Sequence, residues 1–229
     1  MSAVVAHLLS LFLFLSPYSF TPQPVQIPLG GVTVTPAVGC SFTDTDSFAG
    51  TAGTHLPSYN AKWKSTNWSG SHNDLQISNP NGGVSPSSGP SADYDTNVSA
   101  ADSCAQVTVN TLPTTLGYVI LRGAAGTGNK LQGYGCGSNN SAHGTYVYEI
   151  ARFDASTRTM LQAYATVMAT SDVMKCTIVG TTITLYVNGV AQSPTVTDAT
   201  YSAAGNPGMD VQASSTTANY FGSWSAGTD

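Results

Sequence analysis

Two pairs of aspartates are the residues in this sequence best suited to hold a metal ion. The segments Asp44-Thr45-Asp46 and Asp93-Tyr94-Asp95 each place two carboxylates two residues apart. In an extended strand such residues lie on the same side of the backbone, where both can share a hard cation such as calcium. Neither segment has the D-x-D-x-D-G pattern of a dedicated calcium loop, and aspartate is also a common turn residue. Calcium is therefore a candidate ligand, with the second pair the better exposed and the first the more structural.

The only glutamate, Glu149, does not supply the chemistry of a glycosidase. Cleavage of a glycosidic bond by acid and base needs two carboxylates about 5 to 10 Å apart. In an extended strand the same-face neighbours of Glu149 are Val147 and Ala151, so its strand offers no second acid. We interpret Glu149 as the partner of Arg152 or Arg158 in an ion pair that lies at the sheet surface or is partly buried. We predict no catalytic residue, and a polysaccharide lyase or unusual glycoside hydrolase with a scattered site is the enzymatic alternative.

Aromatic side chains next to amides and hydroxyls are suited to sugar binding. A pyranose stacks its C–H face on a ring while its hydroxyls bond polar groups. The stretches rich in Ser, Asn and Gly contain five such candidates, with Trp68 and Tyr134 as exposed rings and Asn67, His72 and Tyr94 as further contacts. Trp63 and Trp224 are interpreted as core residues instead.

The chain contains four cysteines, Cys40, Cys104, Cys136 and Cys176. Their spacing is too wide for a C-x-x-C metal or redox motif. They predict two disulfides, with buried thiols as the alternative, and four cysteines allow three connectivities between which the sequence does not choose. Disulfides persist in oxidising compartments, so this prediction favours an extracellular protein or one on a virion surface.

Composition excludes one class of partner and favours one class of structure. Charged residues make up 8% of the chain and the net charge is -5. Because phosphate binding needs clustered Lys and Arg, the absence of any basic run excludes nucleic acid. A soluble domain averages about 25% charged residues, so this surface must be polar mainly through Ser, Thr, Asn and Gly. Such a composition is typical of strands and turns.

The first 39 residues form a separate segment. The apolar run at residues 8–15 has the length of a secretory signal core, although no Lys or Arg precedes it. It falls short of the ~20 residues that cross a bilayer, so we predict no transmembrane span. The alternative is an arm that packs on neighbouring subunits of a homo-oligomer or particle. Pro22, Pro24 and Pro28 predict an extended connection to the domain that follows.

Residues 40–229 carry the strand signals of one all-β domain. The clearest are two β-branched runs at 176–179 and 182–187, followed by the turn dipeptide Asn188-Gly189. In the second run apolar residues alternate with Thr and Tyr, which predicts one buried and one polar face. The glycine-rich stretch at 123–137 is assigned no strand, and its first part, residues 123–130, is interpreted as a connection between strands. In all, about eleven strands and no helix are expected, as in a two-sheet antiparallel jelly-roll sandwich.

This late meander, with the corner at Gly205-Asn206-Pro207-Gly208, resembles the concanavalin A-like lectin/glucanase superfamily and its laminin-G-like domains. Residues 146–154 and 160–164 look like the paired central strands of that superfamily, and Asp46-Ser47-Phe48 is similar to its opening strand. The resemblance implies a concanavalin A-like sandwich over residues 40–229, preceded by an extended arm. The E-x-D-x-E strand motif of its glucanases is absent. The proline-rich segment is loosely similar to connectors in phage structural proteins.

The sequence therefore predicts a non-catalytic, lectin-like module for glycan binding or adhesion. Its partner is a glycan or cell-surface polysaccharide, met outside the cell or on a particle surface. The alternative is a structural or decoration protein of a virion or extracellular assembly, in which residues 1–39 contact neighbouring subunits and no sugar is bound.

Overall fold

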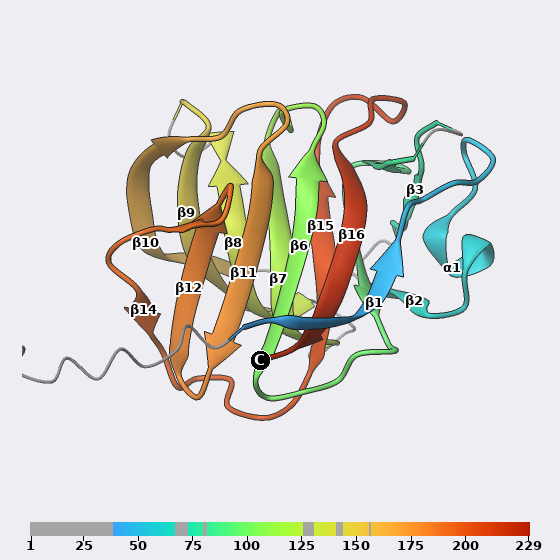
Figure 1. Ribbon diagram of the computed structural model, residues 1–229. Coiled ribbons are helices and arrows are strands. Elements are labelled where there is room, and N and C mark those ends of the chain that lie inside the picture. Colours follow the sequence, from blue (N-terminus) through green and yellow to red (C-terminus); the bar gives the residue numbers. More distant parts are fainter. Residues whose placement is uncertain (1–38, 67–72, 80–81, 126–130, 141–143, 156) are drawn as a thin grey trace, which may run out of the picture. The chain divides into compact units, whose positions relative to one another are not determined.

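The computed structural model describes residues 39–66, 73–79, 82–125, 131–140, 144–155 and 157–229 (Figure 1). These residues form two antiparallel sheets, one of nine strands and one of seven, stacked as a sandwich. The predicted fold class is thus confirmed. The helix whose bounds the structure gives is the one-turn α1 (Leu56–Tyr59), and among the described residues no helix has the length and apolar character needed to span a membrane.

The nine-stranded sheet contains the predicted meander. Its strands run in the order β13 (Val190–Ala191), β12 (Thr182–Val187), β11 (Val173–Val179), β6 (Ser103–Val109), β16 (Phe221–Thr228), β4 (Val84–Pro86) and β3 (Leu75–Ile77), with β1 (Ser41–Asp46) on β16 and β14 (Val196–Thr197) on β12. Figure 1 shows β12, β11, β6 and β16 side by side. The turn at Asn188 and Gly189 has φ angles of 52° and 81°, which the Asn-Gly dipeptide adopts readily. The apolar residues of β12 are buried and Thr182 is exposed, as the alternation predicts.

The seven-stranded sheet differs from the prediction in one respect. Its order is β10 (Thr157–Val167), β9 (Val147–Asp154), β8 (Leu131–Asn139), β7 (Leu116–Ala125), β15 (Asn206–Gln212), β5 (Pro90–Asp95) and β2 (Trp63–Thr66). Strands β9 and β10 pair as expected, but they are not central, because β10 is the edge strand of the sheet and β9 is next to it. The interior position next to β9 belongs to β8, most of which comes from the glycine-rich stretch at 123–137 that was assigned no strand.

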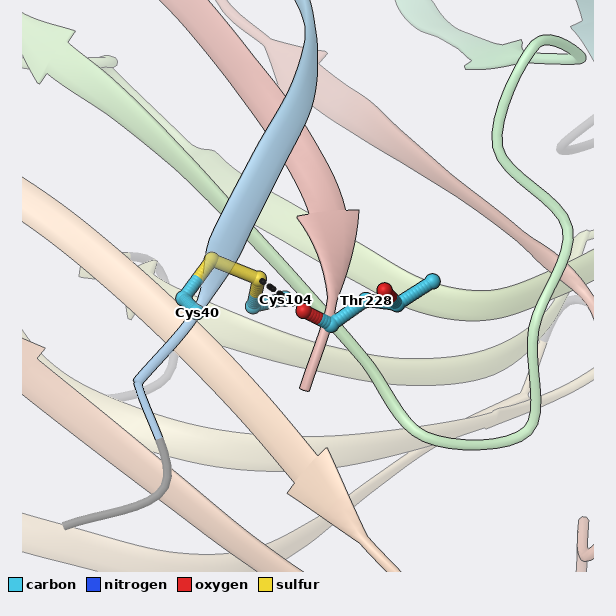
Figure 2. The surroundings of a disulfide bond; sticks show 3 residues. All are labelled: Cys40, Cys104 and Thr228. Carbon is cyan, nitrogen blue, oxygen red and sulfur yellow. Dashed lines mark hydrogen bonds between the residues drawn. A yellow bond between two sulfur atoms is a disulfide. The ribbon is translucent and has the colours of Figure 1, made fainter.

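Two disulfides hold the sandwich together, as the sequence predicts. Cys136 on β8 bonds Cys176 on β11 and so links the two sheets. Cys40, just before β1, bonds Cys104 on β6 (Figure 2). The Cys104 sulfur lies 3.9 Å from the carbonyl oxygen of Thr228 on β16. This second bridge therefore fastens the first strand across the end of the last. Two disulfides indicate that the protein matures in an oxidising environment.

The core between the sheets is aromatic near β1. Trp63 and Trp224 are buried, as predicted, with ring centroids 5.3 Å apart in an edge-to-face arrangement. Phe48 packs on Trp63 at 5.8 Å. Each indole N–H needs a buried acceptor, and this requirement brings carboxylates to the same end of the sandwich.

Candidate functional site

A cleft of about 470 Å³ opens between the first strand, the single helical turn and the last strand. Eight residues line it: Thr45, Asp46, Ser47, Tyr59, Asn60, Ser223, Trp224 and Ser225. In Figure 1, β1 and β16 lie side by side and α1 stands beside the upper end of β1. The lining is therefore mostly hydroxyl and amide groups, with a tyrosine ring as its partly exposed aromatic element.

Local sequence explains how the cleft is built. Strand β1 pairs with β16 so that Thr45 lies opposite Ser225 and Asp46 opposite Trp224. The pairing of β16 with β6 shifts register after Gly222, and Ser223 adopts a φ of 51° at that point. A bulge of this kind re-aims side chains at the edge of a sheet. On the other side, α1 starts with a proline in its first turn and ends at Asn60, whose backbone returns to an extended conformation.

Beneath the cleft, Lys62 is buried among three aspartates. Its side chain is 4% exposed, and its ammonium nitrogen bonds Asp44 and lies 3.5 Å from Asp46 and 3.6 Å from Asp95. The carbonyl oxygen of Thr45 accepts a further hydrogen bond at 3.2 Å. The ammonium group thus occupies the centre of a cage of oxygen atoms, which is the arrangement that a hard cation would require.

Other donors hold two carboxylates of this cage, those of Asp46 and Asp95, in place. The indole N–H of Trp63 donates to Asp46 at 3.0 Å, and that of Trp224 donates to Asp95 at 2.9 Å. The Tyr59 hydroxyl also donates to Asp46, and burial together with this carboxylate raises the pKa of Tyr59. Burial raises the pKa of Asp95 as well, although the Trp224 hydrogen bond opposes that change. The cage therefore couples the core tryptophans to the wall of the cleft.

The calcium prediction gains no support from this arrangement. Three of the four predicted ligands do converge, but on Lys62. The fourth, Asp93, lies apart and accepts a hydrogen bond from the Leu75 backbone at 2.6 Å; burial raises its pKa well above the usual range. Within the described ranges, no group of three or more His, Cys, Asp or Glu side chains is arranged to hold a metal ion.

The predicted sugar-binding aromatics do not form one surface in the described residues. Tyr134 is fully buried, so its predicted exposure is wrong; its hydroxyl donates to Asp198 at 2.7 Å and accepts from the Tyr201 backbone at 3.0 Å. Tyr94 is partly buried on β5, on the face opposite Asp93 and Asp95. Three other candidates, Asn67, Trp68 and His72, lie outside the described residues, as does the apolar run of the N-terminal arm.

The outer face of the seven-stranded sheet carries a second apolar cluster. Along β7, Tyr118 and Ile120 belong to it, while Val119 and Leu121 point into the main core. Tyr118 packs edge-to-face against Phe153 of β9 with centroids 5.2 Å apart. Its hydroxyl donates to Glu149, which also pairs with Arg158 as one of the two predicted partners. The carboxylate of Glu149 is therefore buried and engaged in an ion pair.

Asp210 on β15 provides a test of the electrostatics of this face. It is fully buried, neither carboxyl oxygen has a hydrogen-bond partner among the described residues, and burial raises its pKa well above the usual value. The folded state then binds the proton more tightly than the unfolded state. Stability should consequently fall as pH rises above about 4, the pKa of an unperturbed aspartate.

Asp210→Asn should remove this pH dependence and raise the free energy of unfolding at pH 7 by about 1 kcal/mol or more. The amide does not titrate, so its burial carries no cost of protonating or desolvating a carboxylate, and each unit of raised pKa corresponds to about 1.4 kcal/mol. Urea unfolding of both proteins from pH 4 to pH 8 measures the difference. Parallel stability curves for wild type and variant would contradict the assignment.

Comparison with known proteins shows where this architecture occurs. No protein-family model and no curated protein sequence matches the chain. Among solved structures, the carbohydrate binding module CBM66 from Bacillus subtilis covers 73% of this chain and 92% of its own length, with a TM-score of 0.50 and 14% identity. A Bacillus subtilis protein of unknown function with a galectin-like fold covers 83% and 96%, with a TM-score of 0.53 and 9% identity. The carbohydrate recognition domain of Emp46p, in its potassium-bound form, covers 79% and 94%, with a TM-score of 0.50 and 7% identity.

The chain has the concanavalin A-like fold. At identities of 14% and below the likeness concerns the fold alone, and site residues do not transfer from these neighbours. The functional residues of this concanavalin A-like chain are therefore assigned from its own structure.

Most of the residues that line the cleft were not singled out from the sequence. Serine and threonine are so frequent in this chain that no local sequence pattern distinguishes the four lining hydroxyls, which come from two distant segments. Tyr59 lies in the segment Leu56–Tyr59, whose proline at the second position is a sign of a helix start. Of the predicted site residues that the structure describes, only Asp46 lines the cleft.

Proposed function

We propose that this protein is a non-catalytic glycan-binding module that acts outside the cell and holds its ligand in the cleft between β1, α1 and β16. One observation carries the proposal. The hydroxyls of Thr45, Ser47, Ser223 and Ser225 and the amide nitrogen of Asn60 line the cleft, and they form no hydrogen bond within the part of the chain that the structure describes. These groups are free to exchange water for the hydroxyls of a ligand.

The chemistry of the lining suits a sugar better than other small molecules. Tyr59 supplies a partly exposed ring for the apolar face of a pyranose, and the surrounding hydroxyl and amide groups match its edge. The volume of about 470 Å³ falls in the range of about 300–1,000 Å³ that is typical of ligand sites. Two of the structural neighbours are a carbohydrate binding module and a carbohydrate recognition domain, which supports the same assignment.

The carboxylates near the cleft favour binding without catalysis. Asp46 lines the cleft, but its oxygens already accept from the Phe48 backbone, the Tyr59 hydroxyl and the Trp63 indole. Glu149 is buried in its contacts with Tyr118 and Arg158 on another face. Acid and base cleavage of a glycosidic bond needs two carboxylates that face the substrate, and these two have other roles.

Removal of the Tyr59 ring tests the proposal. Tyr59→Ala should weaken glycan binding by about tenfold, which corresponds to about 1.4 kcal/mol of lost contact. Tyr59→Phe keeps the ring and loses only the hydrogen bond to Asp46, so it should retain most of the affinity. Tyr186→Ala removes a partly buried tyrosine from β12 outside the cleft and serves as the control. Binding is first found on a glycan array and then measured by calorimetry with the best array ligand.

Two results would contradict the proposal. One is unchanged affinity in Tyr59→Ala, provided that its thermal unfolding shows a folded protein. The other is release of reducing ends from a bound polysaccharide, which would make the protein an enzyme.

A further inference from the structure

The cage beneath the cleft carries more negative than positive charge. Asp44, Asp46 and Asp95 surround the one ammonium group of Lys62. Burial raises the pKa of Asp95, yet Asp44 and Asp46 alone already outnumber Lys62. The side chains of Asp46 and Lys62 are each 4% exposed, so water screens their field less than it screens the field of surface charges.

The described lining of the cleft also contains no cationic side chain that would compensate a negative ligand. Asp46 lines it directly, and no Lys, Arg or His is among its described lining residues. Lys62 lies 3.5 Å from the lining residue Asp46, but its ammonium group already bonds Asp44 and the Thr45 carbonyl. Recognition of a carboxylate or sulfate normally relies on a charge-assisted hydrogen bond from such a cation.

We infer that the cleft selects neutral glycans against uronate, sialylated and sulfated ones, because the Asp46 side of the cleft repels an anionic sugar and offers it no cation. This inference rests on the proposed function and adds the chemical class of the ligand. Neutral hydroxyls can both donate to and accept from the serine and threonine side chains. An anionic group placed there loses hydration and gains no counter-charge.

The experiment compares matched pairs of oligosaccharides in the glucose, galactose and mannose series. In each pair the neutral member has CH₂OH at C6 and the other member has a carboxylate there. In the series that binds, the neutral member should bind at least about tenfold more tightly in 20 mM salt, since like charges brought together cost more than about 1.4 kcal/mol. The ratio of the two affinities should decrease in 1 M salt, where the screening length falls to about 3 Å.

A pair of variants at an exposed position of the lining provides the internal control. Ser47→Lys adds a cation without touching the cage and should improve binding of the carboxylate member by about tenfold relative to the neutral one. Ser47→Gln adds similar bulk without charge. Both variants lose the Ser47 hydroxyl and should bind every sugar more weakly, but only Ser47→Lys should change the ratio of the two affinities. Equal binding of both members by the wild type, or tighter binding of the carboxylate member, would overturn the inference while the glycan-binding proposal stands. If no member of any series binds, the proposed function fails and the inference fails with it.

Discussion

Lys62→Met should lower the free energy of unfolding by about 3–5 kcal/mol, the usual effect of removing one partner from a buried ion pair. Methionine keeps the length of the side chain and removes its charge, so the loss reports electrostatics more than packing. Asp44, Asp46 and Asp95 would then repel one another without an ammonium between them. Few single substitutions in the chain should cost more.

The pH dependence of Lys62→Met separates this mechanism from simple loss of packing. Without the ammonium group the clustered aspartates hold protons more tightly in the folded than in the unfolded state. The variant should therefore become more stable as pH falls from 7 toward 4. A protein whose aspartates are held by salt bridges would instead lose stability as pH falls. Urea unfolding across this range measures the effect, and Lys64→Met, at the exposed neighbouring lysine of β2, should change stability by less than about 0.5 kcal/mol. A Lys62→Met protein as stable as the wild type at pH 7 would show that the cage is unimportant for stability.

Replacing both Cys136 and Cys176 by alanine should cost about 4 kcal/mol. The bridge closes a loop with a sequence separation of 40 residues, and in the chain-entropy model a loop of that length stabilises by this amount. The bond joins one strand of each sheet. Without it the unfolded chain gains conformational entropy, and this gain lowers the free energy of unfolding. Denaturant unfolding of the double variant against the oxidised wild type gives the difference.

Reduction provides the matching control. In a reducing agent the wild type loses both bridges and should be at least as unstable as the double variant in oxidising buffer. The double variant keeps only the Cys40–Cys104 bridge, so any further loss on reduction belongs to that bond. Equal stability of the double variant and the oxidised wild type would contradict a stabilising role for the inter-sheet bond.

The meander and the disulfides were predictable from sequence because their signals are local or compositional. Asn188-Gly189 fixes the turn, and strict alternation assigns the buried face of β12. Strand β8 was missed because its glycines match a loop composition. They have a packing role that no local pattern reveals: a Cβ at Gly137 would lie 2.7 Å from the Tyr118 ring, and one at Gly135 would lie 2.6 Å from the Phe153 ring.

The site residues were harder to predict because their partners lie far apart in the chain. Alternation correctly places Asp44 and Asp46 near one cation, but nothing local shows that this cation is Lys62, 18 residues beyond Asp44. Tyr134 lies between two glycines, which favours an exposed loop, yet its hydroxyl reaches Asp198 across 64 residues. The cleft itself arises only when the first and last strands pair.

The central claim is that a glycan binds between β1, α1 and β16. Backbone amide shifts in an NMR titration with the best array ligand test it most directly. The claim predicts that the largest shifts fall in residues 45–47, 59–60 and 223–225, and that Tyr59→Ala abolishes them at the same ligand concentration. Shifts centred on the outer face of the seven-stranded sheet, around Tyr94 and Tyr118, would contradict it.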